Sequence, residues 1–237
     1  AFAKDQANIW ATAQIFNGLV QLDKGLAVKP AIAKKWHITA DAKTYTFHLR
    51  TDVLFHQHEL LSEEQRLVTA HDFVYSFRRL TDAEVASPGA WVMNNVQSYE
   101  ALNDSTLRMT LKTAFPPFLG LLSMPYCSVV PEEVVSQISF RDEPVGTGPF
   151  HFQYWKDNVK LVMRKNPDYF EQGFPKLDAV SIVENNQGQP CLVIVKNNTI
   201  EIFNAINNEL ISSNNIEGLT AIEGAGQLFA SAYNTIN

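Results

Sequence analysis

The chain has 237 residues, of which 46% are hydrophobic and 19% are charged, and its formal net charge is −6 at pH 7. This composition is typical of a globular protein with one large domain or two smaller ones. The acidic balance argues against nucleic acid or an anionic membrane surface as the main partner. The sequence contains no apolar run of about 18 residues, the length that a membrane-spanning helix needs.

The first part of the chain predicts a helix, a hairpin and a β-strand, in that order. Apolar residues recur at helical spacing over residues 5–20, which predicts a helix with Asp5 as its N-cap. A short hairpin with its tip at residues 23–25 follows, and Pro30 is expected to open a helical turn after it. Residues 44–50 alternate apolar and polar side chains, the pattern of a half-buried strand.

The middle of the chain predicts a capped helix and a second pair of strands. Thr69 is an N-cap candidate with Asp72 three residues later, a pair that resembles a capping box. The apolar stripe of this helix is expected at Phe73, Phe77 and Leu80. Two alternating strands joined by a tight turn at residues 103–105 come next, and a short helix and a helix opened by Pro131 complete this part.

Beyond residue 148 the pattern is mainly that of β-strands. Residues 148–155 and 160–166 predict two strands, and a loop at residues 166–175 precedes a third. Residues 185–237 contain 11 asparagines, and only the apolar run "CLVIVKNNTIEIF" can be placed there. The interleaved short strands and helices indicate an α/β (mixed α+β) fold and not a doubly wound parallel sheet.

The stretch "PVGTGPFHFQYW" contains a compact glycine loop, residues 146–148. A dinucleotide-binding loop needs a third glycine and a helix directly after it, whereas His151 stands at that glycine position and an aromatic strand follows. A GxxxxGK[ST] motif is also absent from the sequence. The glycine loop is therefore predicted to be a structural turn. The side chains expected to anchor the following strand in the core are Phe150, Phe152 and Tyr154.

The segment "FHQHE" places His56 and His58 two residues apart. In a strand, both side chains would point to the same face, which is a workable chelate geometry for a divalent metal. Two solvent-side histidines at a strand end give the same pattern, and we favour that interpretation. No metal and no other cofactor is therefore predicted, and a His56–His58 metal site is kept as the alternative.

The sequence shows no catalytic constellation, which favours a binding protein over an enzyme. It has no GxSxG motif, and the apolar context of Cys127 raises the pKa of a thiol, so a Cys127-dependent hydrolase is a distant alternative. Cys127 and Cys191 lie outside any CxxC motif and are expected to be buried and unpaired, with a disulfide as the less favoured alternative. Three tryptophans are expected in the core, with a place in the wall of a ligand site as the alternative, namely Trp10, Trp91 and Trp155.

Five stretches resemble a known family. They are "IAKKWHITADAKTYTFHLRTDVLFH", "VTAHDFVYSFRRLTD", "VASPGAW", "PVGTGPFHFQYW" and "RKNPDYF", in this order. Together they resemble the family 5 extracellular solute-binding proteins, the peptide and nickel receptors of ABC importers. The resemblance covers residues 8–183, and residues 101–135 also resemble the oligopeptide-binding branch of that family.

The resemblance implies a receptor with two lobes that close on a ligand. This chain would be the N-terminal part of a longer protein and would supply a periplasmic-binding-protein-like class II lobe with an inserted extra subdomain. The second lobe would be missing or incomplete. Residues 1–29 and 146–237 would form the first ligand-binding lobe, and residues 30–145 the inserted subdomain.

The resemblance also implies the capture of peptides for delivery to an ABC permease in the inner membrane. The protein would be exported to the periplasm or cell envelope, either free or lipid-anchored, with its signal outside this chain. A monomer with no nucleic-acid partner is expected, and the charge partner of the ligand is expected in the other lobe. The candidate ligand-side residues are Asn17, Gly18, Trp91, Asn94, Thr147 and Gly148.

The sequence departs from the family pattern at two places. Gln57 and His58 stand where the family usually has an Asp/Asn-Gly turn. Asn198 and Glu201 stand where the family tends to have Gly and Asp, so the match is loose beyond residue 185. Metal or metal-chelate (nickel) binding by the same fold stays open as the alternative function.

Overall fold

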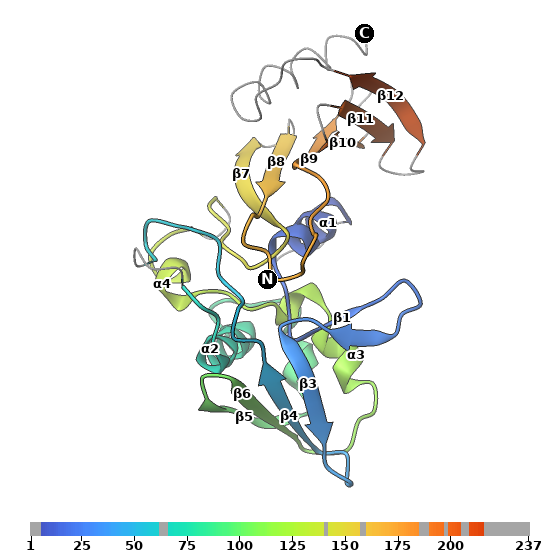
Figure 1. Cartoon of the computed structure of the whole chain (residues 1–237). Coiled ribbons are helices and arrows are strands. Elements are labelled where there is room, and N and C mark those ends of the chain that lie inside the picture. The colour runs from blue at the N-terminus through green and yellow to red at the C-terminus, as the bar shows by residue number, and fades with distance from the viewer. Residues whose placement is uncertain are drawn as a thin grey trace. The chain divides into compact units, whose positions relative to one another are not determined.

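The computed structural model describes residues 6–61, 66–139, 142–156, 160–184, 190–196, 199–204 and 209–215. Contacts divide the chain into two compact units, drawn with their helices and strands in Figure 1. Unit 1 consists of Ala1–His151 together with Asp168–Phe170, and unit 2 of Phe152–Pro167 and Glu171–Asn237. None of the described helices is long and apolar enough to cross a membrane.

Unit 1 combines a hairpin, a four-stranded antiparallel sheet and short helices. Its elements are α1 (Gln6–Ile15), β1 (Val20–Leu22), β2 (Val28–Pro30), β3 (Ala33–Ile38), β4 (Thr44–Leu49), α2 (Ala70–Thr81), η1 (Ala90–Met93), β5 (Val96–Asn103), β6 (Thr106–Leu111), α3 (Phe118–Leu122), η2 (Pro125–Cys127) and α4 (Glu132–Val135). The hairpin is β1-β2, and the sheet has the strand order β3-β4-β6-β5. Every second side chain of β4 and β6 is buried, because strand side chains alternate between the two faces of a sheet.

The core of unit 1 lies between this sheet and helix α2. In the sheet, Phe47 pairs with Trp36 on β3 and with Leu107 on β6. The predicted stripe of α2 is confirmed, since all three of its members are buried, namely Phe73, Phe77 and Leu80. The alternating strands and the amphipathic helix therefore form one apolar cluster, as their sequence periods predict.

Helix α2 begins at the predicted N-cap, Thr69. The Asp72 carboxylate accepts the Thr69 backbone N–H at 2.7 Å and is also 2.7 Å from the Arg66 guanidinium. The Asp72 side chain is only 4% exposed. One buried carboxylate thus caps the helix and neutralises a neighbouring arginine.

We expect Asp72→Asn to lower the free energy of unfolding by about 2–4 kcal/mol. The substitution removes one of the two carboxylates that pair with Arg66, the other being Glu133 at 2.9 Å, and it weakens the cap. Breaking a largely buried ion pair from one side is costly. Urea unfolding of both proteins measures the effect. The matched control is Glu100→Gln, which breaks the exposed pair between Glu100 and Arg108 and should cost about 1 kcal/mol or less. Equal losses for the two variants would contradict the prediction.

Unit 2 is built on a six-stranded sheet. Its strands are β7 (Phe150–Lys156), β8 (Lys160–Lys165), β9 (Ala179–Glu184), β10 (Pro190–Lys196), β11 (Thr199–Asn204) and β12 (Leu210–Asn215), in the order β12-β11-β10-β9-β8-β7. Pairing is antiparallel from β8 to β12. One cross-strand row is buried, consisting of Val162, Ser181, Val193 and Ile202. The apolar run that the sequence places beyond residue 185 therefore forms β10 and β11 in the middle of the sheet.

Two predicted elements differ in the structure. The helix predicted over residues 5–20 is the shorter α1, because Val20 instead pairs with Pro30 in the hairpin. The helical turn predicted after Pro30 is wrong, since Ala33–Ile38 forms strand β3 and pairs with β4. Pro30 is the last residue of a strand in a two-stranded hairpin, a place where a missing N–H is tolerated.

Several aromatic residues expected in the core lie at the surface. Phe150 is buried as predicted, but Tyr154 and Trp155 are 43% and 37% exposed. They belong to β7, which is an edge strand of its sheet and therefore has a neighbour on one side only. Trp91 on η1 is 49% exposed, so the expectation of a core position is wrong for it as well. The side chain of Trp10 lies outside the described residues.

The two compact units do not coincide with the predicted lobes. Leu19 and Val20 belong to the same buried cluster as Ile32 and Phe47, so residues 6–29 fold together with residues that were assigned to the inserted subdomain. The predicted division also states which part of the chain binds the ligand. Contacts alone do not test that statement, so the division into a ligand-binding lobe and an inserted subdomain stays a prediction.

Candidate functional site

The glycine loop, residues 146–148, lies against the C-terminal end of helix α1. The Gly148 N–H donates a hydrogen bond to the Ile15 carbonyl oxygen at 2.8 Å. A Cβ atom on Gly146 or Gly148 would overlap the backbone carbonyl of Ile15 or Gln14. Both glycines are therefore required by the close approach of two backbones. Strand β7 follows directly, which confirms the predicted structural turn.

His56 holds the glycine loop through three hydrogen bonds. Its backbone N–H donates to the Gly146 carbonyl at 2.8 Å, and its ring Nδ1 accepts the Gly146 N–H at 3.4 Å. Its ring Nε2 lies 3.0 Å from the Gly148 carbonyl oxygen. Because a carbonyl can only accept, the ring carries its proton on Nε2.

Burial determines the charge of His56. The residue is 7% exposed, and its burial lowers the pKa of the imidazole to about 4. The nearby ring of His151, with its centroid 6.0 Å away, lowers that pKa further. The expectation of a solvent-side histidine in a strand is therefore wrong for His56, because residues 55–58 form a non-strand segment that packs on the glycine loop.

Asn17 connects the glycine loop to two other segments of unit 1. The Thr147 hydroxyl donates to Asn17 Oδ1 at 3.1 Å, and Asn17 Nδ2 donates to the Tyr169 hydroxyl at 3.5 Å. The Asn17 backbone carbonyl accepts the Val129 N–H at 3.0 Å. Thr147 is 1% exposed, whereas Asn17 is partly exposed. Tyr169 is also partly exposed, so Asn17 and Tyr169 are the parts of this network that solvent or a ligand can reach.

The segment Asp168–Phe170 belongs to unit 1 and is held there by Arg50. The Arg50 guanidinium donates to the Phe170 carbonyl at 3.3 Å and lies 5.0 Å from the centre of the Phe170 ring. Arg50 also donates two hydrogen bonds to Asp52, and these lower the pKa of that carboxyl group. The aromatic pair of the "NPDYF" stretch is thus fixed beside Asn17 by contacts within one unit.

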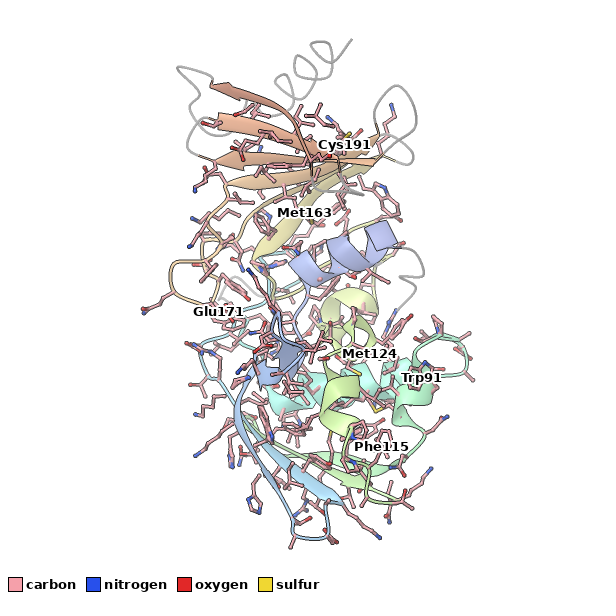
Figure 2. The ribbon with its side chains drawn as sticks, turned by 90° about the vertical axis from the view of Figure 1, so that its right-hand side faces the viewer. Trp91, Phe115, Met124, Met163, Glu171 and Cys191 are labelled. Atoms are coloured by element: carbon pink, nitrogen blue, oxygen red, sulfur yellow. The ribbon has the colours of Figure 1, made fainter. Side chains whose placement is uncertain are left out.

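The structure brings four of the six predicted ligand-side residues together. Thr147 and Gly148 are part of the glycine loop, Asn17 bonds to Thr147, and Gly18 follows Asn17 in the chain. The other two are on a separate segment, where Trp91 lies in η1 and Asn94 is its C-cap residue. Figure 2 shows Trp91 at the surface of unit 1. The prediction that all six contact a ligand stays a prediction.

Sequence reasoning did not connect three residues with this region, namely His56, Arg50 and Tyr169. Each lies in one of the stretches that carry the family resemblance, so their motifs were visible. Their partners lie far away in the sequence, for example 152 positions between Asn17 and Tyr169. Motif spacing could not pair them, because the fold alone sets such contacts.

The ring nitrogens of the two candidate metal-binding histidines have protein partners. Both ring nitrogens of His56 face the glycine loop. His58 Nδ1 accepts the Leu60 N–H, and its Nε2 lies 3.1 Å from the Glu143 carboxylate. Over the described part of the chain, no group of three or more His, Cys, Asp or Glu residues could hold a metal ion. A metal bound by this pair would have to displace these partners.

Cys127 and Cys191 are buried and unpaired, as predicted. Burial raises the pKa of the Cys127 thiol to about 12.

We expect the thiols of the native chain to react with an aromatic disulfide reagent at pH 8 on the order of 100-fold more slowly than those of the denatured chain. Absorbance of the released thiolate measures the rate. Rapid stoichiometric reaction of native Cys127 would contradict the burial of this side chain.

Comparison with known families agrees with the motifs of unit 1. The sequence model of the bacterial extracellular solute-binding proteins, family 5 (middle region), matches residues 27–229. The chain belongs to this family. The family 5 match covers most of both compact units, including the glycine loop, His56 and the "NPDYF" stretch.

Relatives of this family 5 chain include peptide-binding proteins. Di/tripeptide-binding protein 1 of Pseudomonas aeruginosa is 29% identical over 187 residues, which are 71% of this chain and 35% of that protein. The structure of DppA from Helicobacter pylori in complex with the peptide STSA has a TM-score of 0.66 and 33% identity, and covers 76% of this chain and 38% of that one. NikZ from Campylobacter jejuni, solved in complex with Ni(L-His), has a TM-score of 0.60 and 28% identity, and covers 67% and 31%. The chain thus spans about a third of the length of the curated relative.

Proposed function

We propose that this chain is part of the substrate-binding component of an ABC importer, and that the intact protein captures peptides for a membrane permease. The observation that carries the proposal is the family 5 match over residues 27–229. The peptide-binding relatives support peptides as the ligand class. Because the chain spans about a third of the relative's length, binding is assigned to the intact protein.

The exposed parts of the candidate site suit a ligand that is recognised through its backbone. A receptor for peptides of varied sequence gains affinity from main-chain hydrogen bonds and tolerance from roomy side-chain pockets. The amide of Asn17 and the backbone at Gly18 are partly exposed, and Trp91 and Asn94 are exposed. We assign ligand contact to these four residues. Thr147 and Gly148 are buried, and the Thr147 hydroxyl supports Asn17 from behind.

This function needs no catalytic group and no cofactor. The protein is proposed to be a binding protein, not an enzyme, and to work as a monomer without a nucleic-acid partner. Its proposed location is the periplasm or cell envelope, where an exported receptor, free or lipid-anchored, can meet an inner-membrane permease. The family description as extracellular solute-binding proteins supports this location.

A ligand screen of the intact protein tests the proposal. Thermal unfolding is followed in the presence of di-, tri- and oligopeptides, and binders are confirmed by calorimetry. A peptide at 100 times its Kd should stabilise the protein by about 2.7 kcal/mol. Absence of stabilisation by any peptide would overturn the assignment of peptides as the ligand class.

A comparison of peptide affinity between residues 1–237 and the intact protein tests whether one lobe is sufficient for binding. A single lobe cannot enclose a ligand, and most of the surface of a tightly bound ligand is normally buried. We expect the isolated chain to bind the same peptide at least about 100-fold more weakly than the intact protein does. Micromolar binding by residues 1–237 would show that they hold the complete site.

Metal-chelate capture is the second candidate, because the NikZ structure was solved with Ni(L-His). Equilibrium dialysis of the intact protein against Ni²⁺, with and without histidine, distinguishes it from peptide capture. The variant His56→Ala/His58→Ala removes the alternative ligands in this chain. Unchanged nickel uptake by this variant would exclude the His56–His58 pair as the metal site.

A further inference from the structure

The glycine loop depends on one side chain that lies 90 positions away in the sequence. The His56 ring accepts a hydrogen bond from Gly146 and donates one to the Gly148 carbonyl, so it spans the loop from one end to the other. Its backbone N–H provides a third bond to the Gly146 carbonyl. Between these two glycines stands Thr147, whose hydroxyl bonds to Asn17.

We propose that His56 is a positioning residue of the ligand site, which fixes the glycine loop so that the Thr147 hydroxyl holds the Asn17 amide toward the ligand. The contacts form one continuous path of hydrogen bonds from His56 through the loop to Asn17. His56 itself is buried and does not touch the ligand. The orientation of Asn17 is thereby set from behind the binding surface.

The hydrogen-bonding groups of the glycine loop explain why residue 56 is a histidine. The loop presents an N–H at Gly146 and a carbonyl at Gly148, and these need an acceptor and a donor on opposite edges of one rigid group. An imidazole with its proton on Nε2 provides both, whereas an isosteric phenyl ring provides neither. Among the described residues, His151 is a titratable group that faces the ring, at 6.0 Å between ring centroids.

The consequence for Asn17 follows from its two side-chain hydrogen bonds. Thr147 fixes Oδ1 and Tyr169 fixes Nδ2, so the amide has one orientation. If the glycine loop moves, the Thr147 bond is lost and the amide can rotate. A preorganised polar group costs less conformational entropy on binding than a mobile one, so loss of His56 should weaken binding without removing a ligand contact.

The inference rests on the proposed function, and a double-mutant cycle on the intact protein tests it. Calorimetry gives the Kd of a peptide found in the screen for the wild type, His56→Phe, Thr147→Val and the double variant. We expect each single variant to weaken binding about tenfold or more, and the double variant to be no weaker than the worse single one, because both act through the same loop.

His56→Gln, which keeps a donor for Gly148, should recover part of the affinity. His71→Phe is the matched control at an exposed histidine in α2.

Hydrogen exchange of the loop amides tests the role of His56 independently of peptide binding. We expect the Gly146 and Gly148 amides to lose protection about tenfold or more in His56→Phe, while the α2 amides do not change. If the wild type binds no peptide, the proposed function fails, and these amides alone decide the role of His56. Unchanged loop protection, or additive effects of His56→Phe and Thr147→Val on Kd, would overturn the inference.

Discussion

Replacing Gly148 by alanine is expected to lower the free energy of unfolding by about 3 kcal/mol or more, at the upper end of what overpacking costs. The new Cβ would overlap the Gln14 carbonyl and approach the Ile15 carbonyl carbon to 2.5 Å. These are backbone atoms at the end of α1, so no side-chain rotation can relieve the overlap. The loop would have to move away, and the hydrogen bond from Gly148 N–H to Ile15 would break. Gly146→Ala should behave in the same way, because its Cβ would overlap the Ile15 carbonyl.

Gly120→Ala is the matched control for this prediction. Gly120 lies within α3, and a Cβ on it would meet no heavy atom within 4 Å. Alanine has a higher helix propensity than glycine, so this variant should be neutral or more stable by about 0.5–1 kcal/mol. Denaturant unfolding of the three variants provides the comparison. Equal stability of Gly148→Ala and the wild type would show that the loop does not lie against α1 as described.

The stability of the protein is expected to fall between pH 6.5 and pH 4 because of His56. The folded pKa of about 4 lies below the ordinary value of 6.5, so in this range the unfolded chain binds a proton that the folded chain does not. Protonation therefore favours unfolding as the pH drops, and the contribution of His56 is complete above pH 6.5. One pKa unit corresponds to about 1.4 kcal/mol, so the full loss is about 3 kcal/mol.

The measurement is the difference in unfolding free energy between the wild type and His56→Phe as a function of pH. This difference should be largest above pH 6.5 and should shrink by up to about 1.4 kcal/mol per pH unit below it. Data between pH 5 and 6.5 are decisive, because at lower pH the carboxylates with lowered pKa values, such as Asp52, also begin to take up protons. A difference that does not vary with pH would show that the His56 ring is accessible to solvent.

Much of the fold could be predicted from local patterns. The alternation in β4 and β6, the cap and stripe of α2, and the strand after the glycine loop all depend on residues close in sequence. The helical turn after Pro30 was predicted wrongly, because pairing with β4 outweighed the local preference. The exposed positions of Tyr154 and Trp155 could not be foreseen, because the sequence does not say which strand lies at the edge of the sheet.

The sequence by itself determined the family, the mixed α+β character, and the structural turn at residues 146–148. Those properties reside in contiguous motifs, whose residue types and spacing are readable without coordinates. Only the tertiary structure decided that His56 is buried against the glycine loop and that Asn17 joins Thr147 to Tyr169. The physical reason is that a hydrogen bond depends on distance and direction in space. Chain segments separated by 90 to 152 positions acquire these only when the sheet and helices around them have packed.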